Sequence, residues 1–92
     1  MSMEEKFLLA LENARQQAQA LGVRIRPMDM KGAHRCLSSH RESDGFYQLA
    51  DKGQLCLSLE ALAVEKQFTA LFSDEEVNNA LERLLTAGYF MK

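Results

Sequence analysis

The first quarter of the chain carries one apolar stripe with the spacing of an α-helix. The members of the stripe, each three or four residues from the next, are Phe7, Leu11, Ala14, Ala18 and Leu21. Ser2 and Glu5 have the spacing of an N-terminal capping box, and Gly22 suits the left-handed turn that often ends a helix. These signals predict a helix whose stripe packs within the chain. A homodimer seam through the same five residues is the alternative, which we favour less because the stripe covers barely two heptads.

The last helix is predicted by a second capping box, Ser73 with Glu76, and by Gly88 just after its end. These signals place the helix over 74–87. Its apolar positions, which we expect to face inward, are Val77, Ala80, Leu81, Leu84 and Leu85. Its polar positions, which we expect to face water, are Glu75, Asn78, Asn79, Glu82 and Arg83.

Residues 55–72 form the most apolar stretch of the chain. Apolar side chains would line two sides of a helix here, and only a narrow strip near Glu60 and Gln67 stays polar. A helix that is apolar nearly all round is usually buried. We therefore expect residues 58–72 at the centre of the domain, with the helix 74–87 packed against them.

The middle of the chain has weaker patterns. Residues 23–27 alternate apolar and basic side chains and end in a proline. This favours an extended segment, either a linker laid across the core or half of a small hairpin. Asp29 is a candidate N-cap for a helix that reaches His40, and a short helical pattern begins at Phe46 and ends before Gly53.

The composition favours helices over sheets. Fourteen leucines and eleven alanines stand against three valines and one isoleucine, and strands prefer the β-branched residues. With 92 residues, we expect one helical domain over 1–92. The expected fold is all-α, a compact orthogonal array of about four or five helices with one short extended segment at 23–27. Two cysteines fit free thiols in the cytoplasm, and no apolar run approaches the roughly 20 residues that span a bilayer, so we expect no membrane contact.

Charge is unevenly placed along the chain, although the net charge is only −2. Residues 24–41 carry a net +4, whereas residues 42–92 carry −5. The basic stretch is the strongest candidate for a binding surface, because clustered cations attract phosphates. Its members are Arg24, Arg26, Lys31, Arg35 and Arg41. No aromatic residue lies among them for base stacking, so we favour a solvated face paired with the acidic second half of the chain.

His34, Cys36 and His40 are the candidates for metal or catalytic chemistry. A structural zinc site needs four ligands, and only Cys56 is left to supply the fourth. A nucleophile such as Cys36 or Ser39 needs a base and an orienting group nearby, and no sequence motif provides them. We therefore expect no catalytic residues, no metal, no cofactor and no enzymatic activity.

Two segments resemble parts of winged-helix transcription factors. The segment 45–53 resembles the wing strand and its turn, and the run SDEEVNNALERLLTAGYF resembles a helix followed by a strand. In such domains the N-terminal residues of a recognition helix contact base edges. Here those residues would be Asp74, Glu75 and Glu76, which repel phosphates, and the wing-like segment precedes the helix. A nucleic-acid-binding regulator is therefore the second hypothesis.

The tract HRESDGFYQLADKGQLCLSLEALAVEKQF, together with the later NNALERLLTAGYF, is similar to the YoaC-like family of small uncharacterised proteins of enteric bacteria. The resemblance spans nearly the whole chain. It implies an all-helical cytoplasmic domain of unknown function and supplies no functional residues. The first hypothesis is accordingly a small non-enzymatic accessory or adaptor protein that binds another protein or itself.

Overall fold

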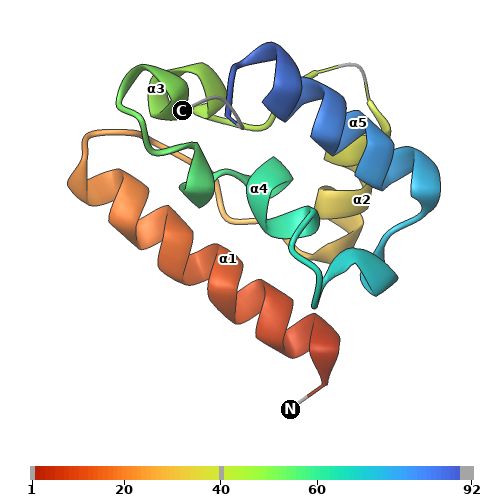
Figure 1. The fold of residues 1–92 in the computed structure, drawn as a ribbon. Helices are drawn as coiled ribbons and strands as arrows, with labels where there is room; N and C mark the ends of the chain where they lie inside the picture. Colours follow the sequence, from red (N-terminus) through yellow and green to blue (C-terminus); the bar gives the residue numbers. More distant parts are fainter. Residues whose placement is uncertain (1, 40, 90–92) are drawn as a thin grey trace.

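The chain folds into an array of helices packed around the short helix α4 (Figure 1). The structure is a computed structural model, and it describes residues 2–39 and 41–89. Within these residues the helices are α1 (Met3–Ala20), α2 (Met30–Ser38), α3 (Phe46–Asp51), α4 (Leu59–Ala63) and α5 (Asp74–Thr86), with the 3₁₀ turns η1 (Leu55–Leu57) and η2 (Thr69–Leu71). Helix α4 contacts both α1 and α5, and α2 packs against α5. The prediction of an all-α array is confirmed, and the described residues include no strand.

Helix α1 begins at the predicted capping box, in which Ser2 and Glu5 each accept a hydrogen bond from the other's backbone amide. Its apolar stripe packs inside the chain, since Phe7 is fully buried and its ring meets two further rings edge-on. Ala14 and Ala18 are buried as well. These three side chains pack within the chain, whereas Leu11 is half-buried and Leu21 is exposed; a homodimer through the stripe stays a prediction.

The segment 23–27, which we call the strap, is extended and crosses the core as a linker. Val23 is buried and Ile25 is half-buried, whereas Arg24 and Arg26 are exposed. The alternation in the sequence thus corresponds to inward and outward side chains, as expected for extended backbone. The strap has no partner strand among the described residues, so it is the linker and not half of a hairpin.

The expected helix over 55–72 is wrong: Ser58 separates η1 from α4, α4 already ends at Ala63, and the chain continues through turns and η2. The Ser58 hydroxyl donates a hydrogen bond to the Leu55 carbonyl (2.7 Å) and accepts one from the Ala61 amide (3.2 Å). It thereby ends η1 and caps α4, which is the role for which serine is favoured at helix starts. The central position is confirmed for α4, every residue of which is buried, but not for the later part of the stretch, where Glu65, Lys66 and Gln67 are exposed.

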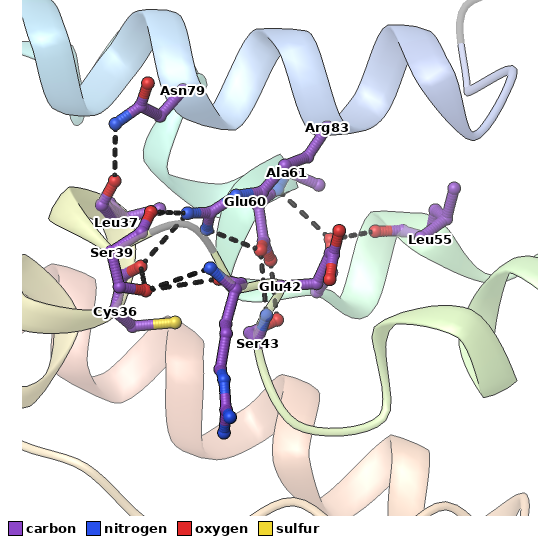
Figure 2. Close-up of polar contacts among 12 residues, drawn as sticks. Cys36, Leu37, Ser39, Glu42, Ser43, Leu55, Glu60, Ala61, Asn79 and Arg83 are labelled. Carbon is purple, nitrogen blue, oxygen red and sulfur yellow. Dashed lines mark hydrogen bonds and ion pairs between the residues drawn. The ribbon is translucent and has the colours of Figure 1, made fainter.

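A buried ion pair between Glu60 of α4 and Arg83 of α5 is the feature that the sequence did not reveal (Figure 2). Both side chains were expected at the surface, yet Glu60 has no exposure and the Arg83 side chain retains only 9%. Arg83 Nη1 lies 3.1 Å from Glu60 Oε2, and its Nη2 donates to the carbonyls of Cys36 and Ser39. Glu60 also accepts from the amide (2.9 Å) and hydroxyl (2.5 Å) of Ser43. The charges are therefore both paired and hydrogen-bonded, as burial requires.

Polar contacts also join α2 to the first turns of α5. Glu76 closes the predicted capping box with Ser73, and its second oxygen lies 2.8 Å from His34 Nδ1. Burial alone would raise the pKa of Glu76, but hydrogen bonds from the Ser73 amide and His34 outweigh it and hold that pKa below its ordinary value. Asn79, expected in water, donates instead to the Leu37 carbonyl at 2.9 Å.

The winged-helix resemblance is wrong at its wing. Residues Phe46–Asp51 form α3, as the short helical pattern predicted, where a wing would require a strand.

Helix α5 carries the inward residues Ala80 and Leu84 as expected, but Leu85 is 62% exposed. The α2 prediction is confirmed by Asp29, which caps it, while His40 lies outside the described residues.

Replacing Arg83 by Met should lower the free energy of unfolding by about 3–5 kcal/mol, because it leaves the Glu60 carboxylate buried without its countercharge. Urea denaturation followed by circular dichroism measures this loss. The double variant Glu60→Gln/Arg83→Met should recover part of it, and Lys66→Met, on the exposed turn, should change stability by less than about 0.5 kcal/mol. A loss below 1 kcal/mol for Arg83→Met would show that the pair is dispensable.

Gly45→Ala should be more destabilising than Gly53→Ala, although both glycines have positive φ angles (+74° and +68°). A Cβ at Gly45 would lie 2.5 Å from Val23 Cγ1, whereas a Cβ at Gly53 would meet nothing within 4 Å. Both variants carry left-handed strain of about 1–2 kcal/mol, and overpacking adds about 1–3 kcal/mol at Gly45 alone. Equal losses in thermal or urea denaturation would mean that the loop moves away from the strap without cost.

Candidate functional site

A groove of about 980 Å³ runs between the second half of α1, the strap, and the loop that leads into α3. Its charged lining residues are Arg15, Arg24, Arg26, Glu42 and Asp44. Arginine guanidinium groups from two separate segments thus lie along one hollow, together with two carboxylates.

The loop wall of the groove is held from inside the core. Ser43 donates twice to the buried Glu60, which fixes the loop's depth in the fold. Gly45 adopts φ +74°, where a side chain would collide with Val23 of the strap. The loop and the strap therefore approach each other as closely as backbone packing allows, and the residue between these anchors, Asp44, faces the groove.

Arg26 and Asp44 form the most complete polar contact in the groove. Arg26 Nε lies 2.9 Å from Asp44 Oδ2, Nη2 lies 3.4 Å from Oδ1, and the Arg26 backbone amide lies 3.4 Å from Oδ2. The hydrogen bond from the guanidinium is the main reason why the pKa of Asp44 is held below its ordinary value. The Arg26 side chain nevertheless remains 87% exposed.

The other two arginines differ in their partners. Arg15 pairs with Glu12 one turn earlier on α1, and the hydrogen bond from Arg15 lowers the pKa of Glu12. The side chain of Arg24 is exposed and makes no hydrogen bond or ion pair with any residue that the structure describes. Arg24 is therefore the groove's cation without an internal partner.

Tyr47, the second residue of α3, supplies an aromatic surface. The residue is 62% exposed, and its ring lies edge-on to that of Phe46, with centroids 5.6 Å apart. Its hydroxyl donates to Glu42 at 2.9 Å, and this bond raises the pKa of Tyr47. An exposed ring with an apolar face and a polar tip is typical of protein interfaces.

The structure divides the predicted basic face. Arg24 and Arg26 line the groove, whereas Lys31 and Arg35 lie on α2 and Arg41 follows it, all three exposed but outside the groove lining. The sequence did not reveal the groove's other residues. The ionisable ones among them are Arg15, Glu42, Asp44 and Tyr47. They come from segments that only tertiary packing brings to the strap, and no local spacing predicts that.

The candidates for nucleophilic chemistry sit in unsuitable surroundings. Cys36 is half-buried, and burial together with the nearby Glu60 carboxylate raises the pKa of its thiol, which disfavours the reactive thiolate. The Ser39 hydroxyl donates to the Cys36 carbonyl at 2.7 Å, and His34 is engaged by Glu76. Among the described residues, no group of three or more His, Cys, Asp or Glu side chains could hold a metal ion.

None of the helices within the described residues is long and apolar enough to cross a membrane.

Arg26→Gln should raise the pKa of Asp44, because the substitution removes the hydrogen bond that favours the ionised carboxylate. Carboxyl ¹³C chemical shifts, followed through an acid titration, measure this pKa directly. In the native chain, Asp44 has a pKa below its unfolded value, so its contribution to stability is present above that value and lost as the pH falls through the folded pKa. An unchanged midpoint in Arg26→Gln would show that the guanidinium does not hold the carboxylate in solution.

No family model, curated protein or solved structure matches the chain. The resemblance to the YoaC-like family therefore stays a prediction, and the case for function depends on the geometry of the groove.

Proposed function

We propose that the chain is a non-enzymatic accessory protein that binds an acidic, extended segment of another protein in this groove. One observation carries the proposal: Arg24 projects from the strap beside Arg26 with no partner of its own in the described structure. Guanidinium groups bind carboxylates through paired hydrogen bonds, so a partner's acidic side chain is the natural complement. The two free cysteines of the described structure suit a cytoplasmic setting.

The groove has the dimensions for a short peptide. Its volume of about 980 Å³ lies at the upper end of the range for small-molecule sites, about 300–1,000 Å³. Apolar surface from Ile25 and Pro27 lies beside the arginines. A peptide can bury apolar atoms against these side chains while its carboxylates meet Arg24 and Arg26. Tyr47 offers a further contact surface at the α3 side.

Nucleic acid is the less favoured ligand for the same groove. Glu42 and Asp44 line it among the arginines, and these carboxylates would repel a backbone with a charge on every nucleotide more than a segment whose acidic residues are spaced. The remaining cations of the basic stretch, Lys31, Arg35 and Arg41, lie outside its lining. Tyr47 is the one exposed aromatic in the groove, where single-strand binding generally uses several rings to stack successive bases.

A fluorescein-labelled octapeptide of alternating Glu and Ser should bind the native chain, and a Gln–Ser peptide of the same length should not. Fluorescence anisotropy at low salt, then at 0.15 M and 0.5 M salt, measures both affinities. Arg24→Glu should weaken binding at least about fivefold, since it replaces a charge-assisted contact with repulsion. Lys66→Glu makes the same change of charge on an exposed turn outside the groove, and it should have less than a twofold effect.

Equal affinity for the Gln–Ser peptide, or equal losses in Arg24→Glu and Lys66→Glu, would contradict the proposal. Mixed-sequence single-stranded DNA and RNA serve as competitors in the same assay. Tight binding of either one that is lost in the double variant Lys31→Glu/Arg35→Glu would support the basic-face hypothesis instead, because those two side chains lie outside the groove.

A further inference from the structure

We propose that Asp44 is a built-in competitor for the groove, and that its carboxylate occupies on Arg26 the place that a partner's carboxylate takes on binding. The inference rests on the proposed function and extends it, because it states which chemistry a partner needs in order to displace Asp44. It concerns a contact within the groove itself, between the strap and the loop wall.

The contact has the form of ligand recognition. The Asp44 carboxylate accepts three hydrogen bonds from a single residue. The donors are Nε, Nη2 and the backbone amide of Arg26. Two guanidinium nitrogens facing two carboxylate oxygens is the arrangement by which arginine binds carboxylates generally. The backbone amide adds a donor that any carboxylate in the same position would use. A glutamate or aspartate of a partner would therefore find all its donors already in place.

The contact is also easy to open. The Arg26 side chain is 87% exposed, and the Asp44 side chain retains 34% exposure. Exposed ion pairs contribute little to folding, because water solvates both groups nearly as well when they separate. This distinguishes the pair from Glu60–Arg83, whose side chains have 0% and 9% exposure. Arg26 can therefore exchange one carboxylate for another without disturbing the core.

Asp44 cannot simply move away, because both neighbours are anchored. Ser43 is hydrogen-bonded to the buried Glu60, and Gly45 packs against Val23. The carboxylate thus stays near Arg26 at a fixed, high effective concentration. The apparent association constant for a partner is then its intrinsic association constant multiplied by the fraction of time that Arg26 is free.

This competition selects for paired acids in the partner. Arg24 is free and Arg26 is occupied, and the alternation of the strap turns both outward. Side chains on the same face of extended chain recur every second residue, about 7 Å apart. A partner with acidic residues at positions i and i+2 can bind Arg24 first and then displace Asp44 from Arg26 intramolecularly. A lone acidic residue has no such advantage over Asp44.

Asp44→Asn should raise the affinity for the labelled Glu–Ser octapeptide about threefold to fivefold; fivefold corresponds to about 1 kcal/mol, the upper end for an exposed ion pair. The variant keeps the shape and a neutral acceptor but loses the competing charge. Asp51→Asn removes an equal charge from an exposed residue outside the groove lining, and it should raise the affinity less than twofold. In the Arg26→Gln background, Asp44→Asn should give no gain, because the contested donor is absent. Urea denaturation checks that each variant is folded.

Three results would overturn the inference. If native chain and Asp44→Asn bind the peptide equally, Asp44 does not compete, although the proposed function stands. If Asp51→Asn gives the same gain, the effect is a general change of the chain's net charge and not competition at Arg26. If neither the native chain nor Asp44→Asn binds at low salt while both are folded, the proposed function fails and this inference fails with it.

Discussion

A carboxylate with no exposure to solvent is the constraint on which the rest of this structure depends. Glu60 lies in the most buried helix of the described chain, where an unpaired charge would be very unfavourable. The fold satisfies it with Arg83 from α5 and with two donors from Ser43. The remaining donors of Arg83 then satisfy two carbonyls at the C-terminal end of α2, those of Cys36 and Ser39. One charge therefore fixes the relative positions of α2, α4, α5 and the loop before α3 (Figure 2).

The candidate site depends indirectly on the same ion pair, through Ser43. The groove's loop wall is the segment that Ser43 ties to Glu60, and the strap opposite it is pressed against Gly45. Asp44 faces Arg26 because the residues on both sides of it are immobilised, not because the exposed contact itself is strong. Within three residues, the anchored Ser43 and Gly45 thus flank Asp44, whose surface contact with Arg26 is easily exchanged. Such preorganisation reduces the conformational entropy that a ligand must remove on binding.

Local rules account for the parts of the fold that the sequence could predict. The boxes Ser2–Glu5 and Ser73–Glu76 are each complete within four residues, and both helix starts were predicted from them. The strap was predicted from its alternation and from the proline at its end. The Glu60–Arg83 pair joins residues 23 apart, so no local pattern distinguishes these charges from solvated ones. Ser58 was overlooked as a helix start because the apolar positions continue past it with helical spacing, and only its two hydrogen bonds show the break. The groove could not be predicted for the same reason as the ion pair.

The uneven charge of the sequence takes on a definite meaning in the structure. A basic stretch facing an acidic second half suggested mutual neutralisation, and Arg26 with Asp44 is one case of it. The side chains of Arg24, Lys31 and Arg35 make no ion pair within the described residues. Arg83, one of the few cations of the acidic half, is paired with Glu60 inside the core. The cations of the strap and α2 are therefore only partly neutralised within the described residues, and those of the strap line the groove. A surface cation beside a concave, partly apolar surface favours an acidic ligand more than a bare solvated face does.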